Sequence, residues 1–150
     1  MSDEKIRRQL REFNAIFKET DAIYSRFAKR SGLSDCAFWL LYSVREADEN
    51  CTQKEICGQW AMNKQTVNSA LKVLEKRGFI TLVPSETDKR SRYIVLTEQG
   101  ERFALENIDI IFQLEQLTLQ KMTDTERDAM IEINRRYYKL FEAETRNIVD

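Results

Sequence analysis

The fold is decided by residues 52–78, TQKEICGQWAMNKQTVNSALKVLEKRG. Thr52 and Glu55 have the spacing of a capping box, in which each side chain bonds the backbone N–H of the other, so a short helix is expected to begin there. Asn63 is a favoured N-cap, and the apolar residues after it recur at helical spacing up to Gly78, a residue typical of helix ends. The stretch therefore predicts two helices joined by a tight turn.

The next stretch, residues 79–100, is FITLVPSETDKRSRYIVLTEQG and predicts a β-hairpin. Two runs rich in β-branched and aromatic residues, 79–83 and 92–96, flank a polar loop at 84–90. This hairpin is the one sheet that the sequence predicts. Two helices joined by a turn and followed by a hairpin have the order of a winged helix-turn-helix, in which the second helix enters a DNA major groove about 12 Å wide.

Long helices are expected before this region. Apolar side chains recur from Ile6 to Phe27 in steps of four and three and predict one long first helix, ended by Ser31 and Gly32. Ser34 can cap a second helix, whose bulky apolar content indicates a core position.

Helices are also expected after the hairpin. Thr97 can cap a single helix that extends past Phe112, and a second capping box at 123–126 begins the closing helix. The predicted fold class is therefore mainly α with a small β-hairpin wing.

The composition excludes several classes of protein. The chain has 150 residues, enough for a single domain, and its net charge of −1 favours no partner by itself. Histidine is absent, and Cys36, Cys51 and Cys57 form no CxxC pair, which leaves no nucleophile–base pair and no typical metal site. The longest apolar run, 37–42, is far shorter than the about 20 residues of a membrane span. We therefore expect a cytoplasmic protein that is not an enzyme, needs no metal or cofactor and has no membrane partner.

Positive charge is concentrated in the second helix of the pair and in the hairpin. Residues 63–92 contain seven basic and three acidic residues, a local net charge of +4 that leaves −5 for the rest of the chain. The polar face of this helix carries amides that suit adenine, hydroxyls that suit bases or phosphate, and lysines. We predict that the chain binds double-stranded DNA. The predicted DNA-binding residues are Lys54, Asn63, Lys64, Gln65, Thr66, Asn68, Ser69, Lys72, Asp88, Lys89, Arg90 and Arg92.

The hairpin carries the residues of a known signature. Asp88, Arg90, Leu96, Thr97 and Gly100 match the pattern D-x-R-x-x-x-x-x-L-T-x-x-G. The chain thereby resembles the MarR family of bacterial transcriptional regulators, and the order of its predicted elements agrees over its whole length. The resemblance implies that Arg90 reaches into the minor groove, whose narrow form attracts a guanidinium, and that Asp88 braces the wing. We interpret the remaining three matches as structural.

The resemblance also implies a homodimer. The DNA-binding domain is then 33–100, and the dimerisation region combines 1–32 with 101–150. A two-fold dimer would read a pseudo-palindromic operator, with half-sites about 10 bp apart. The alternative is a monomer with an intramolecular helical bundle. The predicted dimer interface consists of Ile6, Leu10, Phe13, Ile133, Tyr137, Leu140 and Phe141.

MarR-like regulators bind effectors between the dimer helices and the DNA-binding lobe. A small aromatic or anionic molecule is the effector that this implies here, and the function is then that of a repressor released by it. The alternative is that the aromatic residues are ordinary core. The predicted pocket consists of Phe13, Phe17, Tyr24, Phe38, Trp39, Tyr42 and Phe103.

Two further alternatives stay open. Cys36 lies in the first turn of the second helix, where the helix dipole favours a thiolate, so it is either a redox-active or a plain structural thiol. A winged helix can also serve as a protein–protein interaction module without specific DNA binding. The basic wing favours DNA, because a protein-binding module has no need of it.

Overall fold

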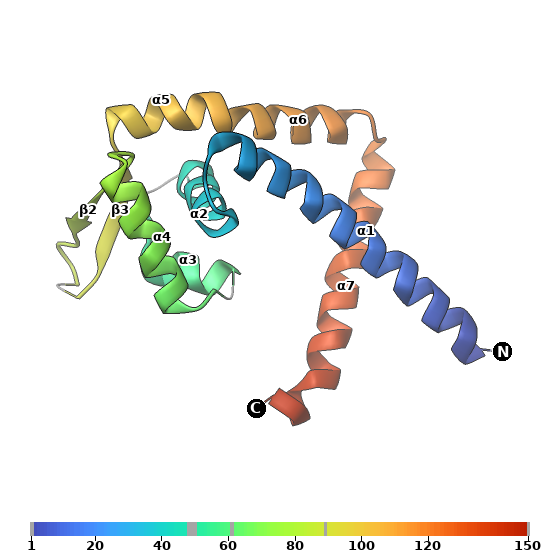
Figure 1. Ribbon diagram of the computed structural model, residues 1–150. Coiled ribbons are helices and arrows are strands. Elements are labelled where there is room, and N and C mark those ends of the chain that lie inside the picture. Colours follow the sequence, from blue (N-terminus) through green and yellow to red (C-terminus); the bar gives the residue numbers. More distant parts are fainter. Residues whose placement is uncertain (1, 48–50, 61, 89, 150) are drawn as a thin grey trace. The chain divides into compact units, whose positions relative to one another are not determined.

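The computed structural model describes residues 2–47, 51–60, 62–88 and 90–149, and this part of the chain is mainly helical with one small sheet (Figure 1). The elements are α1 (Ser2–Ser31), α2 (Asp35–Glu46), β1 (Cys51–Thr52), α3 (Gln53–Trp60), α4 (Lys64–Lys76), β2 (Ile80–Pro84), β3 (Arg92–Leu96), α5 (Glu98–Asn107), α6 (Asp109–Gln120) and α7 (Asp124–Val149). They form two compact units, Met1–Asp109 and Ile110–Asp150. The predicted fold class is confirmed.

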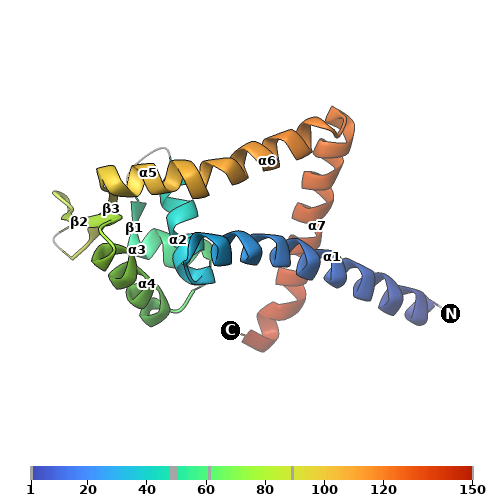
Figure 2. The ribbon, with the colours of Figure 1, turned by 45° about the horizontal axis from the view of Figure 1, so that its top comes forward.

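The core of the first unit is built around α2, which α1, α4, α5 and β3 contact (Figure 2). Phe38, Leu40 and Leu41 of α2 are fully buried, together with Leu74 of α4 and Ile94 of β3. Full burial of side chains of this size contributes about 1.5–3 kcal/mol each. This core fixes the positions of the turn and the hairpin.

The predicted N-caps are all confirmed. Ser34 Oγ accepts the N–H of Ala37 at 3.2 Å, and Asn63 Oδ1 accepts the N–H of Gln65 at 2.8 Å. Thr97 Oγ1 accepts the N–H of Gly100 at 3.0 Å. These bonds satisfy backbone donors that a helix start otherwise leaves free.

Glycines with positive φ end α1 and α4. Gly32 has φ 74° and Gly78 has φ 75°, values that L side chains rarely adopt. After each glycine comes a buried apolar residue, Leu33 or Phe79, whose N–H bonds back into the helix that has just ended. Such closed ends turn the chain sharply, so α2 and β2 begin at fixed positions.

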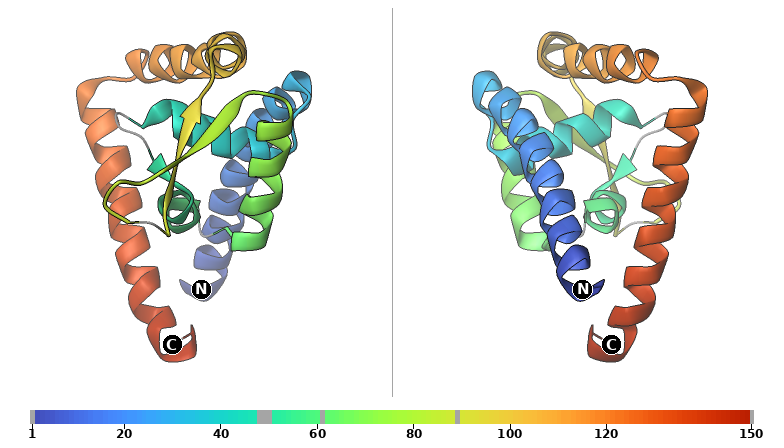
Figure 3. Two further views of the ribbon diagram at one scale, coloured as in Figure 1. Left: turned by 90° about the vertical axis from the view of Figure 1, so that its left-hand side faces the viewer. Right: turned by 90° about the vertical axis from the view of Figure 1, so that its right-hand side faces the viewer.

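The sheet has three strands, where the sequence predicted a two-stranded hairpin. The order is β1-β3-β2, with all neighbours antiparallel, and β1 pairs Cys51 with Ile94 and Thr52 with Tyr93. The prediction missed β1 because a two-residue strand has no periodicity and its partner lies about forty residues further along the chain. Through this pairing the middle of β3 is attached to the strand that leads directly into α3 (Figure 3).

The single helix predicted after Thr97 is divided, which corrects the sequence analysis. The first part, α5, ends at Asn107, and α6 begins at Asp109, although the residue between them is Ile108 and not a glycine or proline. Asp109 makes a bidentate ion pair with Arg45 at the end of α2, at 2.7 and 2.8 Å, and Arg45 also pairs with Glu101. The hydrogen bond to Asp109 is the largest cause that raises the pKa of the Arg45 guanidinium above its ordinary value. Because the two residues of this ion pair lie far apart along the chain, the local sequence does not predict it.

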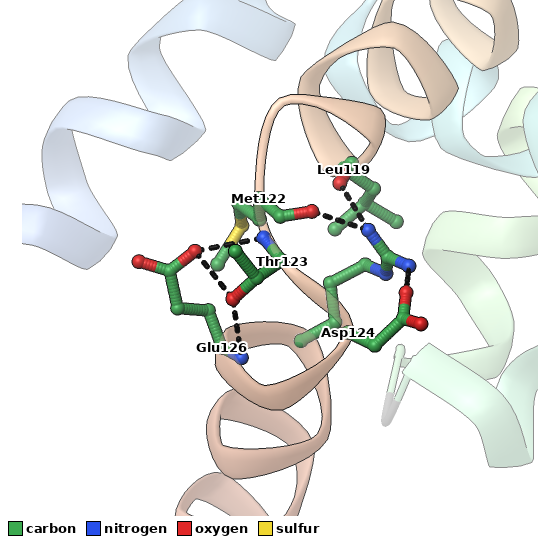
Figure 4. Close-up of polar contacts among 6 residues, drawn as sticks. Leu119, Met122, Thr123, Asp124 and Glu126 are labelled. Carbon is green, nitrogen blue, oxygen red and sulfur yellow. Dashed lines mark hydrogen bonds and ion pairs between the residues drawn. The ribbon is translucent and has the colours of Figure 1, made fainter.

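The second unit consists of most of α6 together with α7. The capping box at its turn is confirmed: Thr123 N–H donates to the Glu126 carboxylate at 2.8 Å and Glu126 N–H donates to Thr123 Oγ1 at 3.3 Å (Figure 4). Arg127 donates to the carbonyls of Leu119 and Met122 and so closes the end of α6. Among the described residues, no helix has the length and apolar character needed to cross a membrane.

Candidate nucleic-acid interface

The predicted face of α4 is exposed. Val67, Ala70, Leu71 and Leu74 are buried, which turns the opposite side of the helix outward. Ser69 Oγ donates to the carbonyl of Gln65 at 3.0 Å, so its lone pairs stay available to a donor. The predicted DNA-binding residues of this helix and its N-cap are all exposed: Asn63, Lys64, Gln65, Thr66, Asn68, Ser69 and Lys72.

The tip of the hairpin is held by its own side chains. Asp88 Oδ1 accepts the backbone N–H of Arg90 at 3.0 Å, and the carbonyl of Asp88 accepts the N–H of Ser91 at 3.0 Å. Ser85 is buried, and its hydroxyl accepts the N–H groups of Thr87 and Asp88 at 3.3 Å each. The backbone N–H of Arg90 is thus bonded to a neighbouring side chain of the hairpin. The predicted contact at Lys89 lies outside the described residues.

A groove of about 560 Å³ lies between α3, α4 and the wing. It brings together Lys54, Lys64, Arg90 and Arg92 from three parts of the chain, with Asp88 as the acidic residue of its lining. Such a concentration of cations along one groove suits a polyanion. The full lining is Gln53, Lys54, Cys57, Lys64, Asn68, Leu82, Asp88, Arg90, Ser91 and Arg92.

Two residues that hold this region in place by hydrogen bonds were not predicted from the sequence. Gln53, the first residue of α3, donates from Nε2 to Oδ1 of Asn68 at 2.6 Å, which links the two helices on their groove side. Ser85 was also missed, although a serine in a polar loop is a common turn residue. Nothing local identified Gln53, because its partner is fifteen residues away on another helix.

The residues predicted for an effector lie on α1, α2 and α5. Trp39 is the centre of one cluster, with its ring centroid 4.7 Å from Tyr24 and 5.2 Å from Tyr42. Phe38 lies 5.7 Å from Trp39 but is fully buried, so it belongs to the core. Trp60, which the sequence analysis did not include, completes the cluster at 4.7 Å from Trp39.

The other three aromatic residues pack elsewhere in the described fold. Phe13 and Phe17 form an edge-to-face pair on α1 with centroids 4.8 Å apart. Phe103 of α5 stacks on Phe79 at 4.2 Å, and the guanidinium of Arg77 lies over both rings. The effector pocket stays a prediction.

Cys36 belongs to the first turn of α2, and its side chain lies near the start of α4. Its Sγ is 3.5 Å from Met62 Sδ and 3.8 Å from the carbonyl of Thr66. Burial, and to a smaller extent the nearby Cys57, raises the pKa of the Cys36 thiol. These effects favour the neutral thiol over the thiolate, in agreement with a structural role.

The residues predicted for the dimer interface are mostly exposed. Leu140 and Phe141 of α7 are each 58% exposed, and Ile133 is 66% exposed. Ile6 and Leu10 of α1 and Tyr137 of α7 are also exposed, whereas Phe13 is half-buried. Apolar side chains exposed along a helix indicate a surface that another molecule covers.

The turn between α3 and α4, the basic hairpin and the third strand define a winged helix-turn-helix. The sequence profile of the MarR family matches residues 31–91, which contain this region up to the wing tip. Over residues 31–91 the chain is thus similar to the MarR family, and the relatives that follow are transcriptional regulators.

Known proteins agree with this assignment. The HTH-type transcriptional regulator Hpr of Exiguobacterium sibiricum is 43% identical over 94 residues, which are 63% of this chain and 49% of that protein. The chain thus spans about half the length of this relative.

Two solved structures show the same fold. The MarR family regulator NMB1585 from Neisseria meningitidis has a TM-score of 0.76 at 22% identity, over 91% of this chain and 95% of that one. Staphylococcus aureus MarR in complex with salicylate and kanamycin has a TM-score of 0.70 at 18% identity, over 92% and 93%.

Proposed function

We propose that this chain is a homodimeric, sequence-specific DNA-binding repressor that a small-molecule effector releases from its operator. The observation that carries DNA binding is the groove beside α4, with Lys54, Lys64, Arg90 and Arg92 on its lining. The groove adjoins an exposed helix face rich in amides and hydroxyls, the groups that read base edges.

The dimer is supported by the exposed apolar residues of α1 and α7. Two copies related by a two-fold axis present two α4 helices to one side of a duplex, so the operator is a pseudo-palindrome. With four groove cations in each copy, affinity should fall about ten-thousandfold between 50 and 200 mM salt, because all of them replace counterions on phosphates.

Selection of bound sequences from a random duplex library tests this function. The expected product is an inverted repeat, and Arg90→Ala reduces affinity for it, mostly on sites with A·T-rich flanks. Arg102→Ala is the matched control, because Arg102 lies on α5, is exposed and pairs with Glu98. Failure to enrich any sequence, together with a flat salt response, would support the protein-binding alternative instead.

The effector and the repressor role have separate support. The S. aureus structure of the same fold holds salicylate, an aromatic anion, and the cluster around Trp39 in this chain is rich in aromatic rings. Titration with small aromatic acids should change Trp39 fluorescence and release the operator, and Trp39→Phe should reduce both responses. A reporter gene behind the selected operator should be silenced by the chain and restored by the acid. Unchanged fluorescence and constant operator affinity would contradict an effector site at Trp39.

A further inference from the structure

The hydrogen bond between Gln53 and Asn68 lies where α3 and α4 border the groove. Gln53 Nε2 donates to Asn68 Oδ1 at 2.6 Å, and both residues line the groove with Lys54 and Lys64. Asn68 is an exposed residue of the predicted reading face, whereas Gln53 is half-buried. The bond therefore acts on a side chain that is in a position to meet DNA.

The backbone of Gln53 is fixed on its N-terminal side. Thr52 pairs with Tyr93 in the sheet, and its N–H and hydroxyl both donate to the carboxylate of Glu55, at 2.6 and 2.9 Å. These bonds lower the pKa of Glu55 and keep it ionised as an acceptor near neutral pH. Since the residue before Gln53 is held by both the strand and the capping box, the origin of the Gln53 side chain is well defined.

The orientation of the Asn68 amide decides what it can read. A carboxamide has an oxygen that accepts and a nitrogen that donates, and the pairing with adenine uses both. Here the oxygen is bonded to Gln53, which leaves the Nδ2 donors for another partner. In the major groove, guanine offers acceptors alone, at O6 and N7, and thymine offers one at O4, whereas adenine places its N6 donor beside its N7 acceptor.

We propose that Gln53 is a positioning residue that directs Asn68 to base edges that offer hydrogen-bond acceptors without a neighbouring donor. The inference rests on the proposed DNA binding. At the base position opposite Asn68 the chain then prefers guanine or thymine, although an unconstrained asparagine favours adenine. Specificity at this position is set by a side chain of α3 that need not touch the base.

The test compares selected sequences for the full chain and three variants. Asn68→Ala identifies the base position, because its preference disappears there. Gln53→Ala frees the amide, so the preference for guanine and thymine weakens about five- to tenfold, the loss expected when one base hydrogen bond is no longer oriented. Gln53→Glu offers only acceptors, so Nδ2 turns toward it, Oδ1 turns to the DNA, and adenine and cytosine become preferred.

The matched control is Gln59→Glu, which adds the same charge to an exposed position of α3. Ratios between sites are compared rather than absolute affinities, because a new carboxylate weakens binding to every duplex. A repeat selected by the unmodified chain establishes DNA binding independently of the outcome for Gln53. If both Gln53 variants then keep the same base preference at the Asn68 position, or if Asn68→Ala alters no position, the proposed role of Gln53 is wrong while DNA binding stands.

Discussion

The two compact units differ in how much of their apolar surface they bury. In residues up to 109, α2 alone buries Phe38, Leu40 and Leu41, and the fold closes around it. From residue 110 onward, Ile111 is the one buried apolar side chain among the described residues, while α7 exposes large apolar side chains along its length. The first unit thus has its own core, whereas the second exposes most of its apolar side chains.

The largest difference in the free energy of unfolding is expected between two leucine-to-alanine variants, one inside the core and one on the surface. Leu41→Ala removes a fully buried side chain and should reduce the free energy of unfolding by about 2–5 kcal/mol, because a cavity remains. Leu105→Ala, at a position that is 62% exposed, is the matched control and should change it by less than about 0.5 kcal/mol. Urea unfolding measures the free energy of unfolding of both variants. Equal losses of stability would contradict the assignment of Leu41 to the core and of Leu105 to the surface.

The exposed face of α7 should respond through association. The double variant Leu140→Ala and Phe141→Ala should weaken the proposed dimer at least about a hundredfold, because these exposed side chains would become buried in its interface. The control is Lys139→Ala with Glu142→Ala, which truncates two neighbouring side chains and leaves the net charge unchanged. Sedimentation at a series of concentrations gives the dissociation constants. The same constant for the two double variants would show that the apolar face is not the interface.

Two ion pairs of the first unit differ in burial and should therefore differ in their contribution to stability. The Arg45 side chain is 26% exposed and that of Asp109 is 19% exposed, so Arg45→Met leaves a largely buried carboxylate and should cost about 1.5–3 kcal/mol. Arg102→Met breaks a pair with Glu98 that is 66% and 88% exposed and should cost less than about 1 kcal/mol. Thermal unfolding of the two variants distinguishes them. A loss with Arg102→Met as large as that with Arg45→Met would contradict the role of burial.

The smallest effect concerns the capping box of α3. The bonds from Thr52 lower the pKa of Glu55 below its ordinary value of 4.5, so the stability they give is present above that value and lost as pH falls through the lowered pKa. Glu55→Gln should therefore be less stable than the unmodified chain at pH 7 and equal to it in strong acid. Glu106→Gln, at an exposed position of α5, is the control. A difference that persists in strong acid would exclude the ionised carboxylate as its cause.

The sequence predicted what local rules decide. The caps at Ser34, Asn63 and Thr97 and the exposed face of α4 were all predicted, because capping and apolar spacing act within a few residues. The missed features depend on partners far along the chain. Cys51 pairs with Ile94, and Gln53 bonds Asn68.

The division of the helix after Thr97 was missed for the same reason. Arg45 and Asp109 are sixty-four residues apart, and the apolar spacing continues across the break between α5 and α6. The groove is an intermediate case. Its cations were predicted as a charged segment, but only folding brings Lys54 of α3 beside Arg90 of the wing.

We propose that a second copy of this chain covers the exposed apolar side chains and thereby places two winged helices on one operator. The mass of the protein in solution, alone and bound to the selected duplex, tests it most directly. We predict twice 17.8 kDa at micromolar concentration and two chains for each inverted repeat. A mass of 17.8 kDa under these conditions, with one chain bound to each duplex, would contradict the account.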